Sequence, residues 1–575
     1  MAETNTGRTY DLPKVFFRQR RRLLIRLIIN GFIQAASIVG SMLLVRHAFD
    51  VLLNPTFDDP EVHLFEMTEV NDIWLLAVGL LACTGSAAWL RWIQRIDAEK
   101  LGQSYVHRVR LMLYDKMGRC APRALSQRSS GSTMLRFIGD LSAIRRWVSL
   151  GLARIVVASI VAIISLTFLA WLDPYLAGAS IFLLSLGLIW NLLLGPKMHS
   201  SISEARKRRG RLAGNISEKI RSFSVIQVFN QVERERKRFR KQSKQLRNAM
   251  IDRARASGKM RVVTEGATAA SLGLVLSLGA LEVFYGMTTS GNVVAAMAVI
   301  GFLSTPIRNL GLVHEYYQGA QVSRQKIIDF MRTKNLRGRA PDLPVLDVKK
   351  GHIEFRNITF ADSLTGISAI ATAGSRIAII GPNGAGKSTL LHIAARLIDP
   401  DSGQVIIDGQ DLAEHNLASI RRMIGIVSPD LPLLRGSIGY NLRYRWREAP
   451  DDEIDKVKEL CALDDMIASF EKGENHRLQE GGQNLSLGQR HRLSLARALL
   501  GNPSLLILDE IDANLDSQAA TAVDRVIKSF PGTILMVSRV QSRLAKADST
   551  WHMREGKIID IESADERYNE LTARR

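Results

Sequence analysis

A glycine-rich stretch that joins an apolar run to a helical pattern is the clearest chemical feature of the 575-residue chain. Residues 376–380 form a β-type run, and residues 381–389 follow with the spacing GxxxxGK[ST]. Glycines let backbone N–H groups curl around phosphate oxygens, while the lysine brings positive charge and the next hydroxyl can ligate Mg²⁺. The stretch predicts a nucleotide phosphate loop made of Gly381, Pro382, Asn383, Gly384, Ala385, Gly386, Lys387, Ser388 and Thr389.

Two adjacent carboxylates, Asp509 and Glu510, follow the apolar run 505–508. A buried strand that ends in carboxylates fits a doubly wound sheet, in which ligands bind at the carboxyl ends of the strands. We expect Asp509 to hold Mg²⁺ together with Ser388, and Glu510 to polarise the attacking water. Glu510 and Lys387 are therefore the predicted catalytic residues. The alternative is that the acidic pair only caps the next helix.

The elements around these motifs predict an α/β domain. From about residue 351 onward, short β-type runs alternate with helical patterns, which is typical of a sheet covered by helices. The stretch 336–341 before this region has the composition of a linker. The phosphate loop therefore belongs to an α/β P-loop NTPase domain that is expected to bind ATP with Mg²⁺.

Six apolar runs precede that domain, and each is close to the roughly 20 residues that cross the hydrocarbon core of a bilayer. Each run holds at most one charge, whereas core helices of soluble proteins are usually amphipathic. The runs therefore predict membrane-spanning helices rather than the buried core of a soluble protein. They cover residues 27–45, 73–90, 152–172, 176–194, 267–285 and 293–312.

The net charge of +21 is unevenly distributed along the chain. Residues 1–350 hold 50 of the 77 Lys and Arg but only 25 of the 56 Asp and Glu. The positive charge gathers in the long connections 91–150 and 197–261, which the positive-inside rule places in the cytoplasm with both termini. This pattern favours contact with membrane lipids and no nucleic acid. Three widely separated cysteines offer neither a disulfide framework nor a zinc site.

The stretch 484–490, which opens a helical pattern through Leu499, makes the prediction more specific. It resembles the LSGGQ signature of ATP-binding cassette (ABC) proteins, with Leu487 in place of a glycine, and 514–516 resembles the D-loop of that family. The resemblance extends from about residue 23 to 561 and implies an exporter-type half-transporter. It also implies a dimer in which each ATP lies between the phosphate loop of one chain and the signature of the other. The signature residues that then contact the nucleotide are Ser486, Gly488 and Gln489.

The expected fold is an α-helical polytopic membrane domain followed by an α/β P-loop NTPase (ABC) domain. The expected divisions are a cytoplasmic segment 1–22, a six-helix transmembrane domain 23–325 with long cytoplasmic loops, a linker 326–350 and an ABC nucleotide-binding domain 351–575. We expect the chain to lie in the inner (cytoplasmic) membrane with its nucleotide-binding domain in the cytoplasm.

Three positions besides Leu487 depart from the family pattern. Pro429 stands where the family usually has the Q-loop glutamine, and Ser538 where it usually has the switch histidine. Asp362 stands where an aromatic side chain usually stacks on adenine. Proline has no side-chain ligand, and serine is much shorter than histidine. Hydrolysis of ATP on this chain's own phosphate loop is therefore expected to be weak.

These departures favour a heterodimer, in which a second half-transporter supplies a fully equipped ATP site that this chain's Ser486 completes. Two alternatives stay open: a homodimeric exporter with atypical ATP sites, and an ATP-gated regulator or channel that moves nothing uphill. Export is the usual direction for this architecture, and the sequence leaves the substrate open. Arg154, Glu265 and Arg308 fall in or beside the spans, where each either contacts substrate or is paired or snorkelled.

Overall fold

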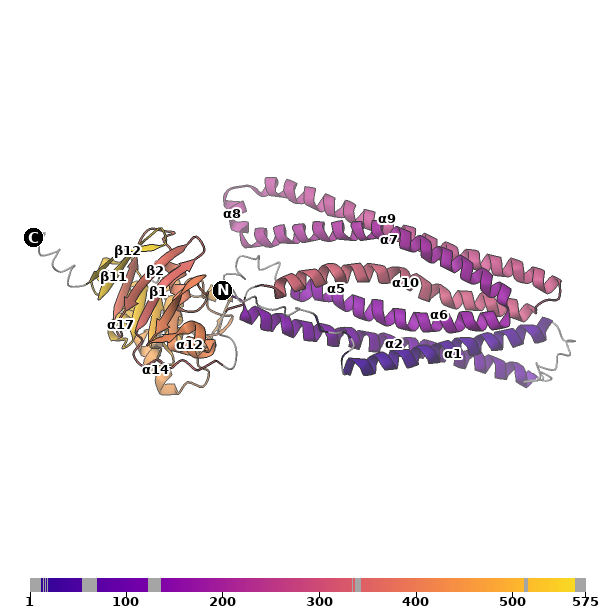
Figure 1. Ribbon diagram of the computed structural model, residues 1–575, viewed down its shortest axis with the longest axis horizontal. Helices are drawn as coiled ribbons and strands as arrows, with labels where there is room; N and C mark the ends of the chain where they lie inside the picture. The colour runs from indigo at the N-terminus through magenta and orange to yellow at the C-terminus, as the bar shows by residue number, and fades with distance from the viewer. Residues whose placement is uncertain are drawn as a thin grey trace, which may run out of the picture. The chain divides into compact units, whose positions relative to one another are not determined.

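The computed structural model describes residues 12–13, 15, 17, 19–53, 70–121, 136–333, 335–336, 343–510 and 515–563. The chain forms two compact units. One holds residues 1–118 and 128–333, and the other holds residues 119–127 and 334–575. The first is here called the membrane unit and the second the nucleotide-binding unit (Figure 1).

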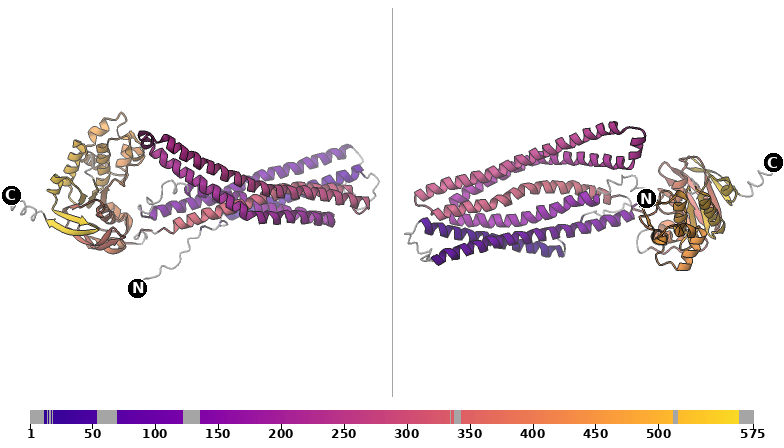
Figure 2. Two further views of the ribbon diagram at one scale, coloured as in Figure 1. Left: turned by 90° about the horizontal axis from the view of Figure 1, so that it is seen from above. Right: turned by 180° about the vertical axis from the view of Figure 1, so that it is seen from behind.

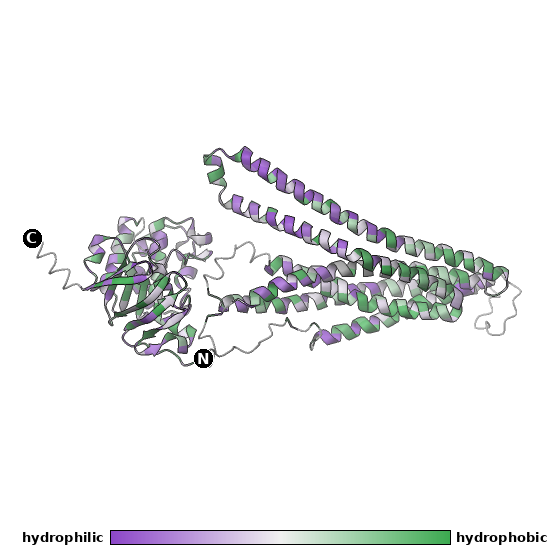
Figure 3. Ribbon diagram, turned by 45° about the horizontal axis from the view of Figure 1, so that its top comes forward, coloured by the Kyte–Doolittle hydropathy of each residue, from purple (hydrophilic) through white to green (hydrophobic). Residues whose placement is uncertain are grey.

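The membrane unit is mainly helical in its described residues, and the six predicted spans lie on its long helices apart from the end residues Leu152, in η2, and Tyr285, just after α9. Among the described residues, five helices are long and apolar enough to cross a membrane, and α10 adds the shorter apolar stretch Ser290–Leu303. Hydrophobic residues gather along one half of α7 and α9 and hydrophilic residues along the half that ends at α8 (Figure 3). The helices are α1 (Gln19–Leu53), α2 (Val70–Arg119), α5 (Leu141–Arg146), α6 (Ala153–Leu172), α7 (Pro174–Arg221), α8 (Phe223–Val228), α9 (Val232–Phe284) and α10 (Ser290–Met331), with the π-helical segments η1 (Arg136–Asp140) and η2 (Trp147–Leu152) on either side of α5.

Asp173 makes the tight turn that the sequence predicts between α6 and α7. Its backbone is extended, and its Oδ1 accepts hydrogen bonds at 3.0 Å from the backbone N–H groups of Tyr175 and Leu176. Pro174 then starts α7, where its missing N–H costs no helical hydrogen bond. The chain therefore reverses direction in a single residue and returns through the membrane.

Helices α7 and α9 lie side by side along their length and are joined at one end by α8 (Figure 2). Between α1 and α2, polar side chains replace part of the apolar packing. The side-chain amide of Asn30 donates to the carbonyl oxygen of Leu90 at 3.0 Å, and Gln34 donates to Gln94 at 3.0 Å. The buried carboxylate of Asp97 pairs with Arg26 at 3.2 Å. Such polar contacts between helices fix their register where apolar contacts alone would let them slide.

In its described residues, the nucleotide-binding unit contains two larger sheets and one short two-stranded sheet, β7-β8. The first sheet is antiparallel, in the order β2-β1-β4-β5, and the second has the order β12-β11-β3-β10-β9-β6. In the second sheet all pairs from β11 to β6 are parallel, and β12 is antiparallel at the edge. The strands are β1 (Ile353–Phe360), β2 (Leu364–Ala371), β3 (Arg376–Ile380), β4 (Ser402–Ile407), β5 (Gln410–Asp411), β6 (Ile424–Val427), β7 (Gly436–Ser437), β8 (Arg477–Leu478), β9 (Leu505–Leu508), β10 (Thr533–Val537), β11 (Ser549–Arg554) and β12 (Lys557–Ser563).

The second sheet is buried on both faces, which explains why β9 and β10 are continuous apolar runs. Successive residues of a strand point to opposite faces. Leu505 and Ile507 pack with the first sheet and α11, whereas Leu506 and Leu508 pack with α14, α16 and α17. The helices are α11 (Lys387–Ala394), η3 (Leu412–Glu414), α12 (Leu417–Met423), α13 (Ile438–Leu442), α14 (Asp451–Leu460), α15 (Asp464–Ala468), η4 (Gly473–Asn475), η5 (Glu480–Gly482), α16 (Leu487–Leu499), α17 (Ser517–Ser529) and α18 (Gln541–Leu544).

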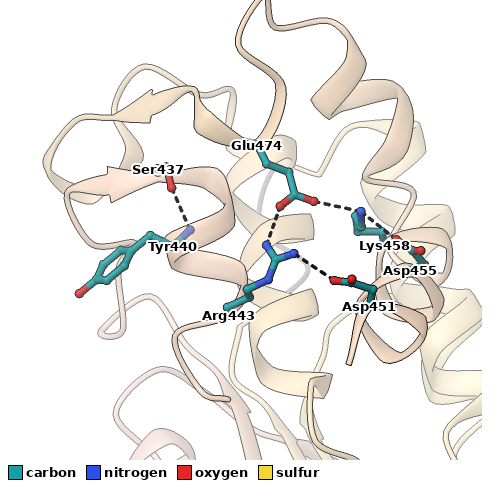
Figure 4. Close-up of polar contacts among 7 residues, drawn as sticks. All are labelled: Ser437, Tyr440, Arg443, Asp451, Asp455, Lys458 and Glu474. Carbon is teal, nitrogen blue, oxygen red and sulfur yellow. Dashed lines mark hydrogen bonds and ion pairs between the residues drawn. The ribbon is translucent and has the colours of Figure 1, made fainter. Parts of the chain in front are cut away.

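Glu474 links three elements between β6 and β9 through ion pairs (Figure 4). Its carboxylate accepts from Arg443 at 2.6 Å and from Lys458 at 2.9 Å, and Arg443 also reaches Asp451 at 3.7 Å. Burial opposes ionisation of Glu474, but the hydrogen bonds from Arg443 and Lys458 outweigh it and hold its pKa below the ordinary value. The network joins α13, α14 and η4 into the helical part that carries α16.

Candidate nucleotide-binding site

The loop between β3 and α11 follows the path of a phosphate-binding loop. Gly381, Gly384 and Gly386 have φ values of 148°, 83° and 97°, which favour glycine. A Cβ atom on Gly386 would lie 2.6 Å from Leu364 Cδ2 and 2.6 Å from the carbonyl oxygen of Ser363. The glycine therefore allows both the left-handed backbone and the close approach of β2, and it places the first turn of α11 directly after the loop.

Lys387 lies at the N-terminus of α11 and folds back over the loop. Its Nζ donates hydrogen bonds at 2.9 Å to the carbonyl oxygens of Gly381 and Pro382. Burial, together with the positive charge of Arg539, lowers the pKa of Lys387 from its ordinary value. Phosphate oxygens are charged acceptors and bind an ammonium group more strongly than neutral carbonyl oxygens do. The loop thus holds the ammonium group of Lys387 at the place where, from the resemblance to ABC proteins, we expect the terminal phosphates of ATP.

Ser388 and Asp509, the two predicted Mg²⁺ ligands, are in direct contact. Ser388 Oγ donates to Asp509 Oδ1 at 3.0 Å, and the hydroxyl of Ser428 donates to Asp509 Oδ2 at 3.3 Å. Among the described residues there is no cluster of three or more His, Cys, Asp or Glu side chains arranged to hold a metal ion. Mg²⁺ usually binds through one or two protein oxygens, with phosphate oxygens and water completing its shell. A hydroxyl beside a buried carboxylate fits that pattern.

The buried carboxyl group of Asp509 allows a test of this assignment. Burial raises its pKa, and the hydrogen bond from Ser388 offsets this only in part, so the ionised form destabilises the fold near neutral pH. We expect Asp509→Asn to unfold at the same or a higher temperature than the wild type at pH 7 without nucleotide. This advantage should shrink as the pH falls toward the ordinary Asp pKa of about 3.9.

The same Asp509→Asn variant should lower the apparent affinity for Mg²⁺ in the presence of ATP by at least about tenfold. Titration of Mg²⁺ into the ATP-loaded protein measures this, with the exposed Asp560→Asn as the matched control. An unchanged Mg²⁺ affinity would remove Asp509 from the metal site.

His392 is a neighbour of this site that the sequence analysis did not include. It lies one turn after Ser388 on α11, and its Nε2 is 3.9 Å from Asp509 Oδ2 and 4.0 Å from Asp430 Oδ2. The sequence could have indicated this neighbour, because His392 is four residues after Ser388 and residues at that spacing share a helix face. His392 therefore adds a polar side chain beside the predicted metal site.

Glu510 follows directly after Asp509 and has a left-handed backbone, with φ of 50°. For a residue other than glycine, this conformation costs of order 1–3 kcal/mol and persists only where the surroundings impose it. Its side chain is exposed, whereas Asp509 is buried. The two carboxylates thus differ in environment: one faces Ser388 inside the protein, and the other is available to solvent water at the surface of the site.

Arg539 is the side chain that reaches the phosphate loop from the end of β10. Its Nη2 donates to the side-chain oxygen of Asn383. Ser538, which the sequence analysis placed at the position of the switch histidine, is buried, and its Oγ accepts from the N–H of Val540. Ser538, the residue that departs from the family pattern, is therefore followed by a residue with a long cationic side chain, Arg539. In the sequence, a basic residue two positions after the strand was the signal for it.

Arg539→Ala should raise the Kd for ATP by about 2- to 12-fold, the effect of losing one hydrogen bond worth about 0.5–1.5 kcal/mol. Arg539→Lys keeps the charge without the planar guanidinium and should lose less. Equilibrium binding of labelled ATP gives both values, and the exposed Arg554→Ala serves as the control. Equal affinities for the Ala variant and the wild type would show that Arg539 does not face the nucleotide.

The signature segment caps α16 as the sequence predicts. Ser486 Oγ accepts from Gln489 N at 3.1 Å, while the Gln489 side chain accepts from Ser486 N at 2.9 Å, which forms a capping box. Gly488 is buried, and a Cβ atom there would collide with the carboxylate of Asp516. Asp516 itself caps α17 by accepting from Ala519 N at 2.7 Å. Asn514 of the expected D-loop lies outside the described residues.

The other two departures lie at the surface. Pro429 is exposed two residues after the end of β6, and the contact to Asp509 in this segment comes from Ser428. Asp362 is exposed in the turn between β1 and β2. Neither position brings an amide or an aromatic ring to the site.

One chain joins a P-loop NTPase unit to long apolar helices, which is the organisation of an ATP-binding membrane protein. Comparison with protein families identifies the class of membrane protein. The family described as ABC transporter transmembrane region matches residues 23–307, and the family described as ABC transporter matches residues 364–513. The chain belongs to the ABC transporter superfamily and has the architecture of an exporter-type half-transporter. It is a multi-pass membrane protein. In this family the ATPase is coupled to transport, Mg²⁺ is the usual metal and half-transporters work as dimers.

Relatives with assigned functions span most of the chain. The ATP-dependent lipid A-core flippase of Syntrophus aciditrophicus is 28% identical over 480 residues, 82% of this chain and 79% of the relative. The fatty acid ABC transporter ATP-binding/permease protein of Mycobacterium tuberculosis is 26% identical over 505 residues, 86% and 79% of the two chains. The solved structure of a bacterial Atm1-family ABC exporter with ATP bound has a TM-score of 0.82 and 21% identity, and the match covers 97% of this chain and 98% of that one. It supports the fold.

Proposed function

We propose that this chain drives the export of a substrate across the cytoplasmic membrane with the energy of ATP, as one half of a dimeric transporter. The observation that carries the proposal is the fusion of an intact phosphate loop, with Lys387 folded over it, to a unit of long apolar helices. The names of the relatives support transport of amphiphilic molecules, because one is a lipid A-core flippase and another a fatty acid transporter.

In the proposed site, Lys387 binds the terminal phosphates and Glu510 orients the attacking water. Ser388 and Asp509 would hold Mg²⁺, which neutralises phosphate charge when bound. The other phosphate-loop residues from Gly381 to Thr389, with the exception of Pro382, would supply backbone N–H groups, and Pro382 would shape the loop. Ser486, Gly488 and Gln489 form the helix N-terminus that addresses the nucleotide of the second subunit.

The tip of the membrane unit supports a dimer. Helix α8 and the residue after it expose apolar side chains at Phe223, Val225, Val228 and Phe229. Apolar side chains gathered at a polar tip mark an interaction surface, because water disfavours their exposure. We assign this surface to contact with the second half-transporter.

The partner in the proposal is a non-identical chain. Pro429 offers no side-chain ligand, and the short hydroxyl of Ser538 accepts a hydrogen bond from Val540 N. Arg539 only donates hydrogen bonds, so it can hold a phosphate but cannot accept a proton as histidine does. These features favour a site that retains ATP, with faster hydrolysis at the partner's site. The homodimer remains the second candidate, since Glu510 is present and exposed.

The proposed organisation keeps the cytoplasmic segment 1–22, the transmembrane domain 23–325, the linker 326–350 and the nucleotide-binding domain 351–575. The basic ends of the helices would face the cytoplasm, where anionic lipid headgroups attract Lys and Arg. The nucleotide-binding domain would lie on the same side.

Inside-out vesicles test this function without knowledge of the substrate. Vesicles from cells that produce the chain are incubated with cytosolic extract and Mg-ATP, and their contents are compared by mass spectrometry with those of Lys387→Ala vesicles. Accumulation of a solute above its outside concentration only with ATP and Lys387 is the expected result. Equilibration without accumulation would instead support an ATP-gated channel, and no ATP-dependent difference would contradict transport.

A further inference from the structure

A cavity of about 590 Å³ lies within the membrane unit between α1, α2, α6 and α10 and the segment that leads into α6. Its volume falls in the range of about 300–1,000 Å³ typical of pockets that bury one small ligand. Four arginines line it: Arg91 and Arg95 on α2, Arg145 on α5 and Arg154 on α6. Glu99 is the acidic residue that lines it with them, so the lining carries excess positive charge.

The arrangement of these charges favours an anionic ligand. Arg91 and Arg95 are four residues apart on α2 and both line the cavity, and like charges at this spacing repel each other. Glu99, one turn further along, is already paired with Arg145 at 2.6 Å. The single carboxylate of the lining is thus engaged by Arg145, while Arg91 and Arg95 add two further positive charges to the cavity. A bound anion would balance the charge of these two arginines. Guanidinium groups also match the geometry of carboxylate and phosphate oxygens.

The rest of the lining is apolar. Val157 and Val161 lie one turn apart on α6, Ile38 comes from α1 and Phe302 from α10. Val157 and Val161 are buried, and Ala158 between them leaves room beside the arginines. The cavity therefore combines a cationic region with an apolar region, which is the complement of an amphiphile.

The position of the two regions along the spans strengthens this match. Arg91 and Arg95 directly follow the apolar run 73–90, whose end the positive-inside rule places at the cytoplasmic surface. Val157 and Val161 lie inside the apolar stretch of α6. An amphiphile in the cytoplasmic leaflet has the same orientation, with its charged head at the surface and its chain toward the bilayer centre.

We propose that this cavity binds a small amphiphile with one anionic head and one alkyl chain, and that such molecules are the substrate class of the transporter. The second part rests on the proposed function, whereas binding to the cavity does not require ATP. The arginines would bind the head, and the apolar lining from α1, α6 and α10 would enclose the chain.

Binding of radiolabelled laurate to the full-length protein in phosphatidylcholine nanodiscs, without ATP, tests the proposal, with empty nanodiscs subtracted. Dodecyl phosphate should compete with laurate, whereas dodecylamine and inorganic phosphate should not. The double variant Arg91→Gln/Arg95→Gln should weaken laurate binding at least about tenfold, as expected for the loss of charge-assisted hydrogen bonds. Arg261→Gln, an exposed arginine that pairs with Glu265 at 2.8 Å, is the matched control and should bind laurate normally.

Ala158→Phe fills the apolar region without changing any charge and should also weaken laurate binding at least tenfold. ATP binding by each variant, measured in the same nanodiscs, verifies that the protein is folded. Undiminished laurate binding in both folded variants, or equal competition by dodecylamine, would overturn the cavity proposal. Competition by inorganic phosphate as strong as that by dodecyl phosphate would overturn the role of the alkyl chain. Normal laurate binding without ATP-dependent transport would contradict only the proposed function.

Discussion

Lys387→Ala is expected to raise the Kd of the protein for Mg-ATP by about 10- to 150-fold, because charge-assisted hydrogen bonds contribute about 1.5–3 kcal/mol. Within the part of the chain that the structure describes, the ammonium group donates to two carbonyl oxygens of its own loop, both at 2.9 Å. Phosphate oxygens are stronger acceptors at the same place. Equilibrium binding of labelled ATP measures the change independently of hydrolysis.

Lys546→Ala is the control for that experiment. Lys546 is exposed, lies just after α18 and is far in sequence from the phosphate loop. Both variants should keep the thermal stability of the wild type without nucleotide. If Lys387→Ala binds ATP as tightly as Lys546→Ala, the loop between β3 and α11 is not the nucleotide site.

The second large effect concerns the signature residue Ser486, which is compared with the predicted catalytic residue Glu510. In the native complex, purified through a tag on this chain, Ser486→Arg should lower ATP turnover by about 10²–10³-fold, the cost of losing a preorganised phosphate contact. Ser486 caps α16 at the surface of the nucleotide-binding unit, where a large side chain would block the partner's ATP. Glu510→Gln, in contrast, should change turnover by less than about twofold, because the partner's site carries most of the hydrolysis.

Comparison of these two variants separates the dimer hypotheses. Similar losses from Glu510→Gln and Ser486→Arg would mean that this chain's own site turns over as fast as the other. Such a result would favour the homodimer with two equivalent sites. A large loss from Glu510→Gln alone would contradict the assignment of the signature to α16.

Hydrophobicity made most of the fold predictable. Apart from two end residues, the six apolar runs lie on long helices, because a chain that crosses hydrocarbon must satisfy its backbone hydrogen bonds internally. The turn at Asp173 was also predictable, since Asp and Pro together both cap a helix and start it. In the nucleotide-binding unit, the spacing of the phosphate loop correctly placed it between β3 and α11.

Contacts between distant segments were the part that sequence could not supply. Ser428 meets Asp509 because parallel pairing sets β6 beside β9, and Ser388 reaches the same carboxylate from α11. Strand order is not written in local sequence patterns. The sequence indicated only that Ser538 stands in place of the family's histidine. The structure adds that the neighbouring residue, Arg539, donates a hydrogen bond to Asn383 in the phosphate loop. The cavity in the membrane unit likewise depends on which helix faces meet, and composition alone does not determine this.

The most direct test of the central claim, an ATP-driven dimer with two unequal sites, is the steady-state ATP turnover of this chain purified alone in nanodiscs. We predict that the isolated chain binds Mg-ATP through Lys387 yet turns it over below about 0.1 s⁻¹, under the usual enzyme range of about 1–10³ s⁻¹. Turnover within that usual range, abolished by Glu510→Gln, would contradict the account.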